Sequence, residues 1–157
     1  MANIALTSPL PGGSQTGFTS PTFTLSDDTS PDTNGLQMFV SALGGTQPAA
    51  VEAHSIAKPF TISYWRPKVY KFLGGLLSNG QLSSVPVNTR KWIVRKGVVV
   101  MDGQPPRVAS CNVSFNIPAG SEEADPDNLR AMISVLVGSL NDYSDSLGDH
   151  TITGTIG

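Results

Sequence analysis

Cationic and polar side chains alternate with apolar ones along three segments of this chain, and they are the residues best suited to chemistry. One set of alternating positions carries Thr61, Ser63, Trp65, Lys91, Ile93, Arg95, Ser110, Asn112 and Ser114. Ammonium and guanidinium groups bind phosphates, while hydroxyl and amide groups contact base edges. The indole of Trp65 or the phenol of Tyr70 can stack on an unpaired base. The pattern predicts an RNA-binding surface, with packing as an equal alternative for Trp65.

The distribution of charge along the chain supports this prediction, although the net charge is only −2. The basic segment, from Lys58 to Arg107, holds nine Lys and Arg residues and one acid, Asp102. Residues 1–57 hold four acids and no Lys or Arg, and residues 108–157 hold seven acids and one Arg. Such segregation creates a local positive field that attracts a polyanion. A basic surface that serves only solubility is the alternative.

Candidate catalytic and metal-binding residues are few. The four acids between residues 122 and 127 suggest an acid–base or cation-binding cluster, but a helix start explains them through capping and the helix dipole. His54 and His150 have no ligand-spaced partner, and we expect both on the surface. Cys111 falls on the apolar side of a predicted strand, where a free thiol packs as a small hydrophobe. The sequence therefore predicts no enzyme, no metal site and no cofactor.

Alternation also predicts the strands that position the polar side chains. The predicted strands are residues 36–43, 58–66, 88–100 and 107–117, with 68–73 continuing the second strand after Pro67. Residues 1–35 are rich in Ser, Thr, Pro and Gly, and they predict at most a short hairpin that decorates the core. A meander of this kind forms an antiparallel sheet.

The hydrophobic period changes from two residues to about 3.6 after Pro118. Asp125 is a suitable N-cap with Pro126 at the first helical position, which predicts a helix over 126–141. A second short helix over 142–147 is predicted to stop at Gly148, and an extended arm follows it. The predicted fold class is therefore α+β, with helix on one face of the sheet.

Composition favours one β-rich domain with a polar surface. Of the 157 residues, 39% are hydrophobic and 14% are charged, with 16 Gly and 12 Pro. This length is sufficient for a core of its own. The single cysteine excludes an intrachain disulfide framework and favours a reducing compartment. Signal-peptide features and an apolar span of about 20 residues are both missing, so we expect a soluble protein, made in cytoplasm, with no membrane partner.

Several stretches of this sequence resemble the coat proteins of single-stranded RNA bacteriophages, the leviviruses. Within residues 87–154 these are VPVNTRKWIVRKGV, MDGQPPR, CNVSFNIPAGSEEADPDNLRAMISVLVGSL and SLGDHTITG. The likeness continues more weakly through KPFTISYWRPKVYKFL, at residues 58–73, and fades before Gly35. It therefore covers about half of the chain well.

The resemblance implies one coat-protein domain over residues 1–157, with an N-terminal β-hairpin region at 1–35, a five-stranded antiparallel sheet within 36–118, and C-terminal helices and an arm at 119–157. It implies an interlocked homodimer with a continuous ten-stranded sheet, and assembly of the dimers into an icosahedral shell. It also implies that the sheet packages single-stranded genomic RNA, and that it binds an RNA hairpin and represses translation. The loop 102–107 would meet other subunits around the shell axes.

Carried onto this sequence, the RNA-contacting positions are the alternating side chains from Thr61 to Ser114, among which Ile93 departs from the polar residue expected at a base contact. The protein is then a virion component assembled in the bacterial cytoplasm. The residues support a dimer independently, because small residues at 131, 134 and 138 suit tight helix packing and a sheet edge is best hidden by another chain.

Two alternative functions stay open from the sequence. A cytosolic dimeric RNA-binding regulator would bind a hairpin and form no shells. A small hydrolase would use the acids between residues 122 and 127, and Asp125→Ala would abolish its activity without unfolding it.

Overall fold

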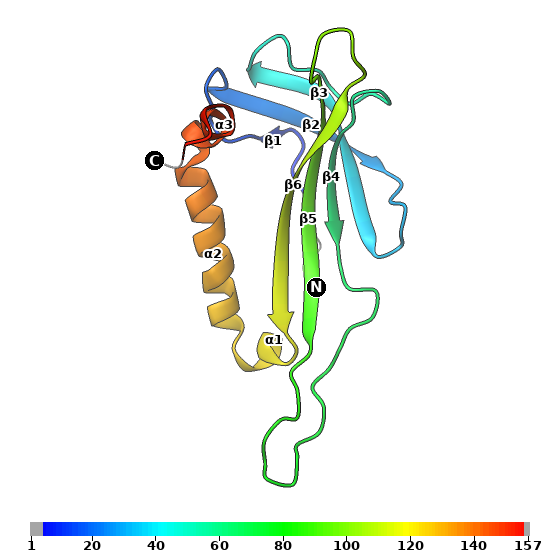
Figure 1. Cartoon of the computed structure of the whole chain (residues 1–157), viewed down its shortest axis with the longest axis vertical. Coiled ribbons are helices and arrows are strands. Elements are labelled where there is room, and N and C mark those ends of the chain that lie inside the picture. The colour runs from blue at the N-terminus through cyan, green and yellow to red at the C-terminus, as the bar shows by residue number, and fades with distance from the viewer. Residues whose placement is uncertain (1–4, 156–157) are drawn as a thin grey trace.

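The computed structural model describes residues 5–155 and contains one antiparallel sheet followed by helices (Figure 1). Six strands lie in the sheet in the order of the sequence. They are β1 (Leu10–Pro11), β2 (Ser20–Asp28), β3 (Gly35–Thr46), β4 (Phe60–Trp65), β5 (Val87–Val98) and β6 (Arg107–Pro118). The helices are α1 (Ser121–Ala124), α2 (Pro126–Asp142) and α3 (Ser144–Thr153). The predicted α+β class with an antiparallel meander is confirmed.

The sheet has six strands and not five, because the N-terminal region contributes more than predicted. β2 pairs with β3 along its whole length, from Ser20 opposite Thr46 to Asp28 opposite Gln37, with a bulge after Thr24. Its Ser and Thr residues alternate with only a few apolar ones, so the strand signal in the sequence is weak. The prediction that residues 1–35 only decorate the core is therefore wrong.

The connection between β4 and β5 is also longer than predicted. β4 ends at Trp65, and no strand continues through residues 68–73. Pro67 explains the break because proline lacks the N–H group that a continuing strand would need. Residues 66–86 form an exposed loop that extends beyond the end of the sheet (Figure 1).

The main helix begins and ends close to its predicted bounds. The carboxylate of Asp125 caps α2 by accepting a hydrogen bond from the Asn128 backbone N–H, at 3.4 Å. The predicted second helix is too short, since α3 runs through Gly148 to Thr153 and is followed by the C-cap Gly154, whose φ of 69° is left-handed. The predicted extended arm is therefore helical up to Thr153, and its last two residues lie outside the described range.

The helices do not pack on the sheet of their own chain. In the described part of the chain α2 contacts α1 and α3 but none of the strands. α1 contacts β6, and α3 is held by the loop before β2, where Ser14 donates to Asp145, Thr16 donates to Asp149 at 2.6 Å, and Gln15 accepts from the Gly148 N–H at 3.0 Å. α2 thus spans the space between two anchors (Figure 1). The predicted helix-on-sheet packing is wrong within one chain.

The isolated chain has almost no hydrophobic core. Val40 and Ala119 are its buried hydrophobic residues within the range 5–155. By contrast, α2 exposes large apolar side chains, including Met132, Val135 and Val137. A globular chain of this size normally buries well over half of the surface of its unfolded state. The expectation of a core of its own is therefore wrong, because the apolar surfaces of the sheet and of α2 stay apart.

Candidate nucleic-acid interface

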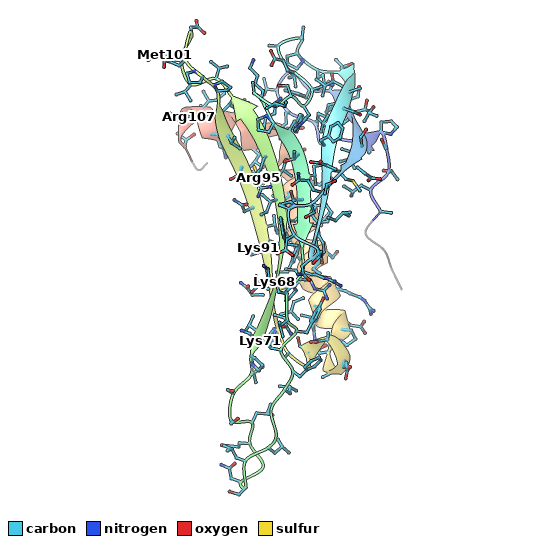
Figure 2. All side chains as sticks on the ribbon, turned by 90° about the vertical axis from the view of Figure 1, so that its right-hand side faces the viewer. Lys68, Lys71, Lys91, Arg95, Met101 and Arg107 are labelled. Carbon is cyan, nitrogen blue, oxygen red and sulfur yellow. The ribbon has the colours of Figure 1, made fainter. Side chains whose placement is uncertain are left out.

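The sheet brings the nine predicted RNA-contacting side chains onto one face, here called the polar face. Residues directly opposite in neighbouring strands point to the same face. The register of β4, β5 and β6 therefore forms three cross-strand rows, which are Thr61–Arg95–Ser110, Ser63–Ile93–Asn112 and Trp65–Lys91–Ser114. Figure 2, seen from the side opposite α2, labels Lys91 and Arg95 on β5. Alternation in the sequence was sufficient to find this set.

The nine residues differ in how much of their surface is exposed. Lys91 and the three β6 residues of the rows are exposed, while Trp65, Ile93 and Arg95 are half-buried. Thr61 and Ser63 are buried, with Ser63 fully so. Both residues were predicted to contact RNA, but in this single chain only 6% of Thr61 and none of Ser63 is exposed. Alternation alone does not reveal this burial.

Ser63 instead positions a cation. Its hydroxyl accepts a hydrogen bond from the Arg95 guanidinium, at 3.0 Å, and donates to the side-chain oxygen of Gln37 on β3, at 3.1 Å. These hydrogen bonds connect Arg95 on β5 to Ser63 on β4 and, through it, to Gln37 on β3, and they hold the guanidinium along the polar face. A pre-ordered guanidinium loses less conformational entropy on binding a phosphate.

A shallow hollow of about 330 Å³ lies on the polar face. Its lining residues are Trp65, Arg66, Thr89, Lys91, Ile93 and Arg95. Trp65 packs its ring over Gly35, where a Cβ atom would lie 2.9 Å from two ring carbons. The indole therefore packs against β3 and borders the hollow at the same time. Sequence reasoning missed Arg66 and Thr89, although Thr89 continues the alternation of Lys91.

The two cations of the polar face, Lys91 and Arg95, form no salt bridge within the described residues. Within the described residues the salt bridges are Lys58–Glu52 at 2.7 Å, Lys68–Asp32 at 2.8 Å and Arg130–Asp127 at 2.8 Å. Hydrogen bonds from Lys68 and, to a smaller extent, from Asn34 lower the pKa of Asp32 to about 2. Neither Lys91 nor Arg95 belongs to one of these pairs, so both retain an uncompensated charge that an anion can neutralise.

The opposite face of the same strands is apolar. Tyr64 and Trp92 meet edge to face with ring centroids 5.5 Å apart, and Ile62 and Val94 lie in the next row. Cys111 shares this face, opposite Val94, but it is exposed. Its predicted buried environment is therefore wrong for a single chain, because no helix covers this part of β6.

Both histidines are partly buried beside aromatic rings. His54 is half-buried and not fully exposed as a surface residue would be, since it accepts a hydrogen bond from the Phe60 N–H at 3.0 Å and lies beside the Phe39 ring. His150 is half-buried too, near the Tyr143 ring. Across residues 5–155 there is no group of three or more His, Cys, Asp or Glu residues suited to a metal ion. None of the helices described is long and apolar enough to cross a membrane.

Comparison with known proteins identifies the fold. No protein-family model matches the chain, and no curated protein matches it. Among solved structures it is similar to the virus-like particle of bacteriophage ESE020, with 40% identity and a TM-score of 0.95 over 98% of this chain and 100% of that one. The virus-like particle of bacteriophage GQ-907 shows 17% identity and a TM-score of 0.48, over 98% of this chain and 92% of that one. The virus-like particle of Beihai levi-like virus 32 shows 12% identity and a TM-score of 0.47, over 86% of this chain and 88% of that one.

The fold and the similarity to ESE020 define a structural protein of the virus capsid, and not an enzyme. The chain belongs to the coat proteins of levi-like bacteriophages. The resemblance seen in the sequence is confirmed, and the hydrolase alternative is excluded. The protein is accordingly a component of the virion.

Proposed function

We propose that this coat protein dimerises, assembles in the bacterial cytoplasm into an icosahedral shell, and packages single-stranded RNA on the polar face, with the whole chain acting as one domain. The observation that carries the proposal is the set of three cross-strand rows, with two cations free of ion pairs, on a chain 40% identical to one that forms a virus-like particle. A shell that packages RNA holds a polyanion, and the polar face offers the matching charge.

A dimer would explain two features of the single chain, which are the unpaired edge of β6 and the exposed apolar surfaces. β6 pairs with β5 on one side, and no strand of the described residues pairs with its other edge, which is 12 residues long. An unpaired edge of this length is a template for a second strand. Two copies that pair through β6 would form one sheet of twelve strands, and each α2 would meet the apolar face of the partner. This arrangement would bury the apolar surfaces that stay apart in one chain.

RNA contact is supported by the chemistry of the polar face. Lys91 and Arg95 would bind phosphates, and the exposed hydroxyl and amide groups of Ser110, Asn112 and Ser114 would contact bases or sugars. Trp65 borders a hollow in which an unpaired base could stack. A hairpin bound here would also give translational repression. The apolar Ile93 in the middle row favours general packaging over base recognition at that position.

Expression of the chain alone in bacteria tests the proposal. We expect particles by negative-stain electron microscopy, a dimer as the smallest species by light scattering, and nuclease-protected RNA inside the particles. Particles that contain no RNA would contradict the packaging role. Dimers that bind RNA but form no particles under any assembly condition would instead identify a dimeric RNA-binding regulator.

A further inference from the structure

The loop between β4 and β5, residues 66–86, exposes eight large apolar side chains. Those exposed are Val69, Tyr70, Phe72, Leu73, Leu76, Leu77, Leu82 and Val85, and Phe72 and Leu76 expose 80% and 68% of their surface. No charged residue occurs from Phe72 to Val87. The loop extends beyond the ends of the strands (Figures 1 and 2). Surface loops are normally polar, so this composition needs a physical explanation.

The base of the loop is fixed to the sheet. Asn88 at the start of β5 is buried, and its side-chain amide donates to the Lys71 carbonyl, at 2.9 Å, while its side-chain oxygen accepts from the Lys71 N–H, at 3.0 Å. The Leu73 side chain lies directly against Gly120, where a Cβ atom would overlap it. These contacts hold the loop in one direction relative to β5 and β6.

The tip of the loop is also structured. Leu76 and Leu82 form a β-bridge, the Leu77 N–H donates to the Gln81 carbonyl at 2.8 Å, and Gly80 adopts a φ of 79° that favours glycine. A hairpin tip of this kind keeps its leucines on the outside. Apolar side chains held in a defined shape and left exposed are the usual signature of a protein contact.

The position of the loop favours a copy outside the dimer as its partner. A second chain paired along the β6 edge would meet β6, whereas the loop joins β4 to β5 and its tip lies past the ends of the strands (Figure 1). The relative that forms a virus-like particle aligns over 98% of this chain, so the loop belongs to the shared fold. A particle requires contacts between dimers in addition to those within them.

We propose that the apolar tip of the β4–β5 loop packs on a chain of a neighbouring dimer and is a principal contact between dimers in the shell. This proposal rests on the shell-forming function proposed above. The proposed contact lies at the N-terminal end of β5. The short loop 102–107, which the resemblance implies to contact other subunits, lies beyond the C-terminal end of the same strand. With 12 residues at about 3.3 Å each, β5 separates the two loops by about 40 Å.

The triple variant Leu76→Ser, Leu77→Ser, Leu82→Ser tests it. Because burial of one leucine corresponds to about a tenfold change in an association constant, the variant should form dimers but few or no shells. Light scattering reports the dimers, electron microscopy the shells, and circular dichroism the fold. The matched control is Ile56→Ser with Ile152→Ser, which removes two exposed apolar side chains elsewhere and should leave assembly unchanged.

Shells formed by the triple variant at the parent's yield would overturn the proposal, and so would loss of the dimer with the fold intact. Failure of the parent chain to form shells would instead contradict the proposed function. A second measurement does not depend on a disruptive variant. With Cys111→Ser as background, Leu77→Cys should react with a maleimide about tenfold more slowly in shells than in dimers, since the contact buries it. Equal rates would also overturn the proposal.

Discussion

The two faces of the sheet are built by the same strands, but the side chains of one face are largely satisfied within a single chain and those of the other are not. On the polar face Gln37, Ser63 and Arg95 satisfy one another by hydrogen bonds at 3.0–3.1 Å. On the apolar face Ile62, Val94 and Val113 are left half-buried, and α2 makes no contact with a strand of the described chain. The difference indicates that the binding surface forms with the fold of the chain, whereas the hydrophobic core forms only when a second chain arrives.

Placing a charge on the apolar face should have the largest effect. Val113→Asp would bury a carboxylate in the proposed dimer, at a cost of about 3 kcal/mol or more. We expect dimers and shells to be abolished, as measured by light scattering and electron microscopy. Asn112→Asp puts the same charge on the next residue of β6, which faces the other way, and should preserve the dimer. If both variants dimerise like the parent, the apolar face is not the dimer interface.

Removing the free cations of the polar face should come next. The double variant Lys91→Ala, Arg95→Ala should bind RNA more weakly, and the slope of log affinity against log salt concentration should fall by about 0.7 to 0.9 for each phosphate that the variant no longer binds. Filter binding over a salt series gives that slope. The control Lys58→Ala, Lys68→Ala removes two cations that are already paired with acids and should change the slope less. An unchanged slope in the first variant would mean that RNA lies elsewhere.

A smaller effect is expected from the hydrogen bonds within the polar face. Ser63→Ala removes the hydroxyl that joins Arg95 to Gln37 in a fully buried position, which should lower the free energy of unfolding by about 1 to 2 kcal/mol. Denaturant titration measures this decrease. Ser110→Ala, on an exposed position of the same face, should lie within about 0.5 kcal/mol of the parent. Equal stabilities of the two variants would show that the network contributes nothing.

The smallest effect concerns the ion pair between Lys68 and Asp32. Hydrogen bonds from Lys68 and from the backbone and side chain of Asn34 lower the pKa of Asp32 from 3.8 to about 2 in the folded chain. These contacts therefore stabilise the fold above pH 3.8 and cease to do so as the pH falls to about 2, and Lys68 contributes the largest part. Lys68→Ala should therefore reduce stability at pH 6 and make little difference near pH 2. Lys91→Ala serves as control, since its effect should not follow that pH range. If the loss of stability caused by Lys68→Ala stays constant with pH, the Lys68–Asp32 ion pair is not the source of that stability.

Local patterns predicted the secondary structure well where they were strong. The strands at 60–65, 87–98 and 107–118 and the helix from Pro126 agree with their predicted bounds within about two residues. The predictions failed where the signal was weak or depended on distant residues. The strand signal of β2 is weak because Ser and Thr make up much of it, and residues 68–73 of the loop were predicted to continue the strand beyond Pro67, although the strand ends at Trp65.

The sequence by itself determined which side chains share a face, because the period of two along a strand is a local property and the register follows from neighbouring strands. It also determined that positive charge gathers between Lys58 and Arg107. Only the tertiary structure decided that Ser63 is buried and holds Arg95, since Gln37 lies 26 residues away along the chain. Only the tertiary structure decided that α2 stands clear of its own sheet, because that depends on the two anchors at α1 and α3 and not on the apolar stripe of the helix.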